Sequence, residues 1–246
     1  MPIDPETANP VLQDKSESMA DWYRRYYSKE GANRNNLRAN PEVLFQTLAA
    51  EAAIVRAFRY VKQDPANAKA LDVGCGGGGD LFQLFRMGYR PENVSGIDIQ
   101  IDRITEGRML YPQVNLIAGD ATQMPFYDAS FDLVFESTMF ATLPDDVISA
   151  AIASEMLRVS HSDSYIVLLD WRTPKPRDPN YKALGMKRLK SLFKVGTATE
   201  IAGIAKGALV PPVGRFLSSK MPCLYFPTAV AFPFLVGQLA YVLRVI

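Results

Sequence analysis

The chain has 246 residues and a formal net charge of +1, and 48% of its residues are hydrophobic and 22% charged. This composition can supply the core of one α/β domain with small additions. A nearly neutral chain argues against a nucleic-acid partner held by strong electrostatics. The two cysteines, Cys75 and Cys223, fit neither a disulfide framework nor a zinc-ligand spacing. Because the N-terminus lacks a basic and then apolar signal pattern, we expect a cytoplasmic protein.

Residues 1–40 are expected to form an arm and a lid helix ahead of a main domain over residues 41–246. Residues 1–18 are polar and contain proline, which is typical of a loose arm. Residues 20–29 place four aromatic side chains on one helical face, more than an isolated helix exposes comfortably. We expect this helix to cover a ligand crevice, and packing on a neighbouring helix is the alternative. The four are Trp22, Tyr23, Tyr26 and Tyr27.

A helix is expected over residues 42–61, and strands and helices then alternate as far as residue 170. This alternation is typical of a doubly wound parallel sheet with right-handed crossovers. The expected strands are residues 70–74, 93–98, 114–118, 131–135 and 165–169. The expected helices between them are residues 79–88, 100–109 and 144–159.

The last 76 residues are less regular. A basic amphipathic helix is expected over residues 181–193, and a strand interrupted by glycines over residues 197–210. Beyond them, residues 222–246 contain a single charged residue, which by length alone would allow a membrane span.

Two prolines distinguish between a membrane span and a folded segment at this apolar end. Pro227 and Pro233 divide it, and a continuous membrane helix through two prolines is costly. We therefore expect a helical insert over about residues 211–237 and a final antiparallel strand over residues 238–245, with membrane attachment as the alternative. The expected fold class is α/β, with a mostly parallel, doubly wound sheet of seven strands.

The stretch from Lys69 to Asp80 is the most informative in the chain. An apolar run enters four consecutive glycines, and a helical pattern follows them. Strand, glycine turn and helix together present bare backbone to a ligand at a helix N-terminus. A G-x-G-x-x-G pattern alone is weak evidence. Two acids strengthen the indication of a ligand site, because Asp72 lies inside the first strand and Asp98 ends the next one.

Four motifs in order resemble the class I S-adenosylmethionine-dependent methyltransferases, over about residues 68–170. The resemblance implies a Rossmann-like fold and S-adenosylmethionine as cofactor. The motifs are Leu71-Asp-Val-Gly-Cys-Gly-Gly-Gly, Gly96-Ile-Asp-Ile, Ala118-Gly-Asp-Ala with Met124-Pro-Phe, and Phe131-Asp-Leu-Val-Phe-Glu.

The resemblance also implies roles for single residues. Asp98 is expected to accept hydrogen bonds from both ribose hydroxyls, and Asp120 one from the adenine amino group. Asp72 is expected to help hold the cationic amino end of the cofactor, because a buried acid needs such a partner. The alternatives are a helix cap for Asp98 and an Asx turn for Asp120. The expected cofactor-binding set is Asp72, Gly74, Gly76, Asp98, Ile99, Asp120, Ala121, Met124 and Glu136, where Ile99 and Met124 offer apolar contact to adenine or else pack in the core.

Catalysis is less well marked in the sequence. Glu136 and Asp170 end strands at the ligand side, and each is a candidate proton acceptor, with capping or positioning as the alternative. His161, the one histidine, precedes a strand at the opposite end of the sheet and is read as a surface residue. No metal-ligand cluster is visible, so we expect metal-independent transfer. The loop after Glu136 lacks the signature of amino-group nucleic-acid methyltransferases.

Three tail segments resemble methyltransferases of bacterial surface-polysaccharide gene clusters: Leu192–Gly196, Gly207–Arg215 and Phe234–Gln238. That likeness implies polysaccharide biosynthesis and O-methylation of a sugar or another small hydroxylated acceptor, in a lipid-linked form as a variant. The alternatives are carbon methylation of a lipid-like ring, which the apolar insert favours, and cofactor binding without catalysis. We expect a small-molecule or glycan acceptor, no nucleic acid, no stable membrane span, and a cytoplasmic protein with peripheral attachment to the inner membrane as a variant.

Overall fold

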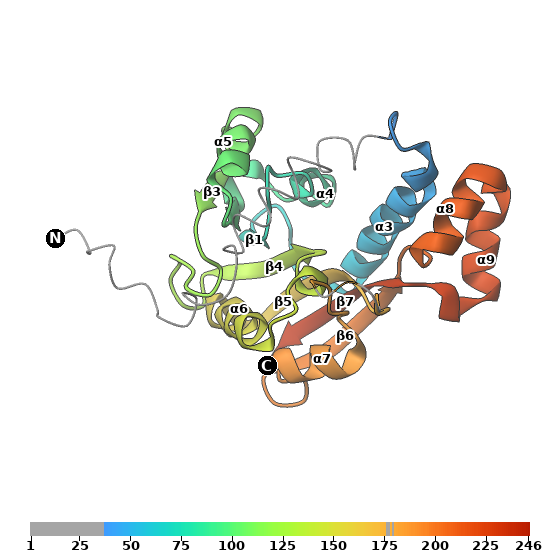
Figure 1. The fold of residues 1–246 in the computed structure, drawn as a ribbon. Helices are drawn as coiled ribbons and strands as arrows, with labels where there is room; N and C mark the ends of the chain where they lie inside the picture. The colour runs from blue at the N-terminus through green and yellow to red at the C-terminus, as the bar shows by residue number, and fades with distance from the viewer. Residues whose placement is uncertain (1–36, 176–177, 179) are drawn as a thin grey trace.

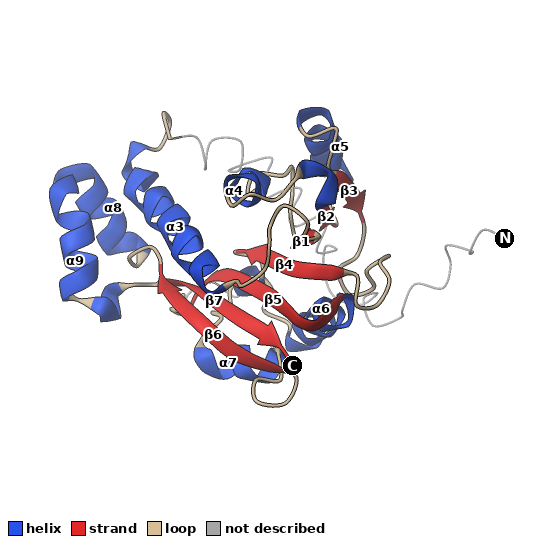
Figure 2. Ribbon diagram, turned by 180° about the vertical axis from the view of Figure 1, so that it is seen from behind, coloured by secondary structure: helices blue, strands red, loops and turns tan. Residues whose placement is uncertain are grey.

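The computed structural model describes residues 37–246 except 176, 177 and 179, so the expected lid helix lies outside the described residues. Within this part of the chain, seven strands form one sheet in the order β3-β2-β1-β4-β5-β7-β6 (Figures 1 and 2). Neighbours among β1 to β5 are parallel, and β7 is antiparallel to β5 and β6. The strands are β1 (Ala70–Val73), β2 (Val94–Asp98), β3 (Asn115–Ala118), β4 (Phe131–Ser137), β5 (Ser160–Trp171), β6 (Thr199–Lys206) and β7 (Gln238–Val245).

Helices cover both faces of the sheet, as Figure 1 shows. One face packs against buried apolar side chains of α3, α4 and α5, and the other against those of α6 and α7. The helices are α3 (Leu44–Ala57), α4 (Leu81–Arg86), α5 (Ile101–Leu110), α6 (Asp146–Val159), α7 (Met186–Leu192), α8 (Pro211–Lys220) and α9 (Tyr225–Ala231). Strands buried on both sides explain why β1 is apolar at nearly every position.

The expected α/β class and the sheet of seven strands are confirmed. The last strand, β7, is antiparallel and enters the sheet between β5 and β6, and α8 and α9 form the helical insert that precedes it. Figure 2 shows this insert at the end of the molecule beside α3. The chain therefore keeps its C-terminal apolar segment within the folded body.

The start of β5 differs from the expectation of a strand over residues 165–169. β5 begins at Ser160, and its pairing with β4 shifts between Phe131 opposite Ser160 and Leu133 opposite Tyr165. The residues between form a bulge in which Asp163 has a φ of +69°. Asp is one of the few residues that tolerate this conformation, so no glycine is needed here.

The basic helix is shorter than the expected residues 181–193, because α7 begins only at Met186. The preceding residues use their backbone groups elsewhere. The N–H of Lys182 donates to the carbonyl of Ala141 at 2.9 Å, and that of Leu184 donates to Trp171 at 2.8 Å. These bonds join the segment to the end of β5 and to the loop after β4, which prevents an earlier helical turn.

Candidate functional site at the carboxyl edge of the sheet

All five parallel strands bring a carboxylate to the same edge of the sheet. Because parallel strands end at one edge, residues that are far apart in the sequence meet there, and open α/β sheets bind ligands outside this edge. Four of these acids lie within the last two residues of their strands, and the fifth follows β3 by two residues. They are Asp72 (β1), Asp98 (β2), Asp120 (after β3), Glu136 (β4) and Asp170 (β5).

The glycine turn between β1 and α4 is held by the end of β2. Gly74 has a φ of +76° and Gly76 one of +54°, conformations that glycine adopts without a Cβ penalty. The N–H of Gly74 donates to the carbonyl of Ile97 at 2.8 Å, and the N–H of Gly76 donates to Oδ2 of Asp98, also at 2.8 Å. Of the two expected cofactor glycines, Gly76 is thus in direct contact with the expected ribose acid, and Gly74 is bonded to the residue before that acid.

Asp98 is fixed from two sides in this structure. Its Oδ1 accepts the N–H of Gln100 at 2.9 Å, in addition to the bond from Gly76 to Oδ2. Each oxygen retains a lone pair for a further donor. Ile99, the next residue, is 43% exposed and is available for apolar contact with a ligand. The N-cap residue of α5 is Gln100, and no side chain caps this helix, so the helix-cap alternative for Asp98 is wrong. The ribose role stays a prediction.

Asp72 is buried, and its Oδ2 has no hydrogen-bond partner in the described structure. Burial, together with the nearby carboxylates of Asp80 and Asp98, raises the pKa of Asp72 well above its ordinary value, and the Arg103 guanidinium offsets part of this rise. A buried carboxylate with an open acceptor site favours a cationic ligand. The ammonium and sulfonium charges of S-adenosylmethionine fit this requirement.

The residues after β3 are only partly as expected. Oδ1 of Asp120 accepts the N–H of Thr122 at 2.8 Å, so the Asx turn forms, while the exposed side chain keeps Oδ2 for another donor. Ala121 is half-buried beside it. The Met124 side chain is 4% exposed and belongs to the core on the α6 side, which is the packing alternative. Adenine contacts by these residues stay predictions.

Glu136 and Asp170 both support the loop that follows β4. Glu136 accepts the backbone N–H of Met139, and Asp170 accepts the N–H of Ala141 at 2.8 Å and that of Trp171 at 2.6 Å. Both carboxyl groups are fully buried. Burial raises the pKa of Asp170 to about 7, and burial and the neighbouring Asp170 raise that of Glu136. Positioning is what these bonds do in the structure, and proton transfer stays a prediction.

His161 lies at the other edge of the sheet. Its Nε2 is 2.9 Å from Oδ1 of Asp132, near the start of β4. The pKa of His161 is raised by the Ser162 carbonyl and by Asp132. A group at this edge is far from the five strand-end carboxylates in the topology of the sheet, which agrees with its reading as a surface residue.

Three neighbours of the glycine turn were not expected from the sequence. The Arg103 guanidinium lies against Gly76, where an added Cβ would come within 2.2 Å of its Cζ. Met139 lies against Gly74, where a Cβ would be 3.0 Å from its sulfur. Asp80 is hydrogen-bonded to Ser137, and burial raises its pKa. Arg103 and Met139 reach the turn from other parts of the chain, so no local pattern marks them, whereas Asp80 directly follows Gly79 at the N-cap position of α4.

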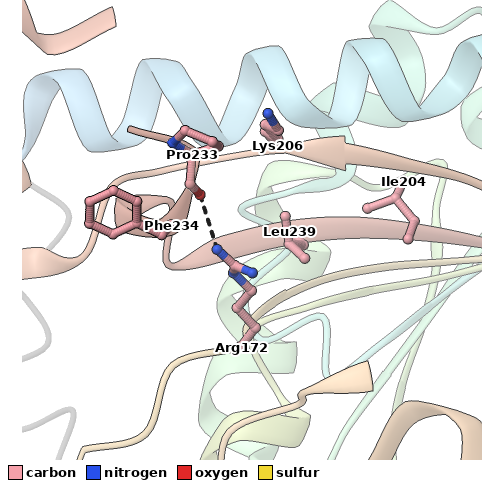
Figure 3. A pocket seen from close by; sticks show the side chains of 6 residues that line it. All are labelled: Arg172, Ile204, Lys206, Pro233, Phe234 and Leu239. Carbon is pink, nitrogen blue, oxygen red and sulfur yellow. Dashed lines mark hydrogen bonds between the residues drawn. The ribbon is translucent and has the colours of Figure 1, made fainter. Parts of the chain in front are cut away.

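A pocket of about 460 Å³ opens beside this edge, where β5, β6 and β7 meet the end of the insert (Figure 3). Arg172 follows β5, and its Nε and Nη2 donate to the carbonyls of Val236 and Pro233 at 2.8 and 3.1 Å. Leu239, one of the lining residues, is the register partner of Asp170, which is itself buried and is not among the lining residues. The lining residues are Arg172, Ile204, Lys206, Pro233, Phe234 and Leu239.

Residues 64–202, more than half of the chain, match the family model described as a methyltransferase domain. A demethylmenaquinone methyltransferase of Beutenbergia cavernae is 33% identical over 108 residues, which are 43% of this chain and 42% of that protein. A 2-methyl-6-phytyl-1,4-hydroquinone methyltransferase of Synechocystis is 33% identical over 111 residues, 44% of this chain and 33% of that protein. The chain thus spans less than half of the length of these curated relatives.

A solved structure shares the fold at much lower identity. The geranyl diphosphate C-methyltransferase of Streptomyces coelicolor, in complex with Mg²⁺, geranyl diphosphate and S-adenosyl-L-homocysteine, has a TM-score of 0.59 and 13% identity. The superposition covers 79% of this chain and 77% of that one. With the strand order, the glycine turn held by Asp98 and the family match all in agreement, the chain belongs to the class I S-adenosylmethionine-dependent methyltransferases.

Proposed function

We propose that this protein transfers the methyl group of S-adenosylmethionine to a ring carbon of an apolar acceptor of the hydroquinone class. The observation that carries the proposal is the pocket that Leu239, the strand neighbour of Asp170, helps to line. Four of its six lining residues are apolar, and the other two, Arg172 and Lys206, are cations. Apolar walls with a few placed polar groups are typical of sites for apolar small molecules.

The lining favours this acceptor over a free sugar. A sugar presents hydroxyl groups on most sides, and none of the six side chains that line the pocket is a carboxylate, an amide or a hydroxyl. A hydroquinone presents a flat apolar ring with two hydroxyls, which match apolar walls and two cations. Both curated relatives reported above are named for methylation of quinone-type or hydroquinone-type molecules, which supports the same class.

S-adenosylmethionine supplies an activated methyl group on a positively charged sulfur. The chain has to orient the acceptor and exclude water. In this proposal Asp170 accepts the proton of an acceptor hydroxyl, because a pKa of about 7 suits proton transfer near neutral pH. Arg172 and Lys206 then stabilise the phenolate that forms, whose charge activates the ring carbon. After that carbon has received the methyl group, it loses its hydrogen to water as a proton, and the ring becomes aromatic again. Glu136 supports the loop after β4, since its Oε1 already accepts the Met139 N–H.

We also propose that the protein works at the surface of the inner membrane. An acceptor with a lipid tail resides in a membrane, so a cytoplasmic enzyme would meet it at the inner membrane surface. No helix in residues 37–175, 178 and 180–246 is long and apolar enough to cross a bilayer.

The test uses the purified full-length chain with S-adenosylmethionine carrying a labelled methyl group. The acceptors are a short-chain demethylated hydroquinone kept reduced, a sugar nucleotide and a lipid-linked sugar. We expect label only in the hydroquinone, on a ring carbon by NMR. Label on a sugar hydroxyl, with none in the hydroquinone, would refute the proposed acceptor.

A variant that fills the pocket separates acceptor binding from cofactor binding. Ile204 lines the pocket and is 39% exposed, so Ile204→Trp is expected to raise the KM for the hydroquinone at least tenfold. Its affinity for S-adenosylhomocysteine should stay unchanged. Val230→Trp, at a side chain that is 80% exposed and outside the pocket lining, is the matched control. Equal KM values for the two variants would contradict the placement of the acceptor.

A further inference from the structure

The C-terminal insert exposes seven large apolar side chains between residues 216 and 234. Single exposed apolar residues are normal, but contiguous apolar patches on a soluble domain mark interaction sites. We call this surface the insert face. Its seven members are Phe216 (54% exposed), Met221 (39%), Leu224 (44%), Phe226 (43%), Val230 (80%), Phe232 (49%) and Phe234 (70%).

The insert has a separate inner side that accounts for its folding. Tyr225 is fully buried, and its hydroxyl accepts the N–H of Leu209 at 3.2 Å. Its ring lies 5.6 Å from that of Phe45 on α3, and Leu217 of α8 belongs to the same core cluster. The insert face is therefore not an incompletely buried part of this hydrophobic core. It remains exposed after the inner side has packed.

The charged residues around the insert face indicate which kind of surface it binds. From residue 201 to the C-terminus the chain contains no Asp or Glu, and its charged residues there are Lys206, Arg215, Lys220 and Arg244. Arg215 and Lys220 are exposed on α8, and Phe216 and Lys220 share one side of that helix at a spacing of four residues. An acid in the neighbourhood is Glu42, in the 3₁₀ turn Pro41–Val43, which contacts α8.

We infer that the insert face docks on the surface of a membrane that contains anionic lipid. Aromatic and aliphatic side chains enter the headgroup boundary, and the two cations of α8 meet lipid phosphates. Helices of ten and seven residues are too short to span a bilayer, so they would lie on it. Figure 1 shows α8 and α9 at the outer end of the molecule beside α3, where a flat surface can reach them.

Docking in this orientation brings the pocket close to the membrane. Phe234 belongs both to the insert face and to the pocket lining, and Pro233 next to it also lines the pocket. An acceptor with a lipid tail could then enter the pocket without leaving the bilayer surface. This use of the docking rests on the proposed function, whereas the docking itself does not.

The experiment is co-sedimentation of the full-length chain with sucrose-loaded vesicles. One set contains equal parts of phosphatidylglycerol and phosphatidylcholine, and the other contains phosphatidylcholine alone. We expect binding to the anionic vesicles that is at least tenfold stronger and that weakens with added salt. A triple variant, Phe216→Ser with Val230→Ser and Phe232→Ser, should lose at least tenfold in partition. These three residues lie outside the pocket lining.

A matched control replaces three exposed apolar residues elsewhere: Met109 (75% exposed) and Leu110 (63%) on α5, and Val147 (76%) on α6. This control should bind vesicles like the wild type, and both triple variants should keep the wild-type circular dichroism and affinity for S-adenosylhomocysteine. A second variant, Arg215→Gln with Lys220→Gln, should lose the preference for anionic lipid but keep weak binding to both vesicle types.

Three results would overturn the inference. They are no vesicle binding by the wild type, equal binding by the wild type and the insert-face variant, and a wild-type dimer that this variant converts to a monomer. The last result would assign the face to a second copy of the chain. Methyl transfer to a short-chain hydroquinone tests the proposed function separately. Methyl transfer without vesicle binding would refute only the membrane docking. Vesicle binding without methyl transfer would refute only the proposed acceptor.

Discussion

Replacement of Asp98 by Ala should lower both the stability of the protein and its affinity for the cofactor. The carboxylate accepts the N–H of Gly76 at 2.8 Å and the N–H of Gln100 at 2.9 Å. A hydrogen bond to a charged group contributes about 1.5–3 kcal/mol. Because the side chain is half-buried and water can replace part of the loss, we expect the variant to lose about 2–3 kcal/mol of unfolding free energy.

In a chain of this size, that loss corresponds to a decrease in Tm of about 4–12 °C, measured by calorimetry. If Asp98 also accepts the ribose hydroxyls, the Kd for S-adenosylhomocysteine should rise by about 10- to 150-fold in titration calorimetry, which corresponds to a further 1.5–3 kcal/mol. Asp98→Asn retains one acceptor oxygen and should fall between the wild type and Asp98→Ala. Glu92→Ala, an exposed acid before the other end of β2, is the control.

The two measurements separate the two roles of Asp98. An Asp98→Ala variant with a Tm within 1 °C of wild type would refute the idea that this carboxylate holds the glycine turn. A variant with lower Tm but unchanged affinity for S-adenosylhomocysteine would refute the ribose assignment and leave the structural role.

Three further predictions concern two buried acids and one close contact. The pKa of Asp72 is raised in the free protein, and a cationic ligand favours the ionised form, so binding of S-adenosylmethionine should release protons at pH values between the ordinary pKa of 3.8 and the raised one. Binding enthalpies that are equal in buffers of different ionisation enthalpy would contradict this. The pKa of Asp170 rises from an ordinary 3.8 to about 7 on folding, so the native state binds more protons than the unfolded chain. Stability should therefore fall as pH rises from about 4 to about 7. Asp170→Asn should flatten this part of the curve of Tm against pH, and an unchanged slope in this variant would contradict the prediction. A Cβ on Gly203 would lie 2.3 Å from the Tyr60 ring, so Gly203→Ala should lower the unfolding free energy by about 1–3 kcal/mol in urea unfolding. Adding Tyr60→Ala to this variant should restore most of the lost free energy. No recovery in the double variant would contradict the role of this close contact.

The sequence by itself determined the elements and the cofactor motif. Apolar runs bounded by glycine and proline predict β1 to β4 within a few residues, because period and turn chemistry act over short distances. The same holds for the final strand, where Pro227 and Pro233 argued against a continuous helix. The glycine turn was visible since its residues are adjacent in the chain.

The tertiary structure alone decided what meets this turn and what the strand-end acids support. Asp98 binds Gly76 across 22 positions, and Asp170 binds the N–H of Ala141 across 29. Arg103 reaches Gly76 from α5 without any local pattern that marks it. Such contacts depend on how strands align and helices pack, which no short segment encodes. Exposure is decided in the same way, since the apolar insert closes its inner side on α3 and leaves Val230 and Phe234 outside.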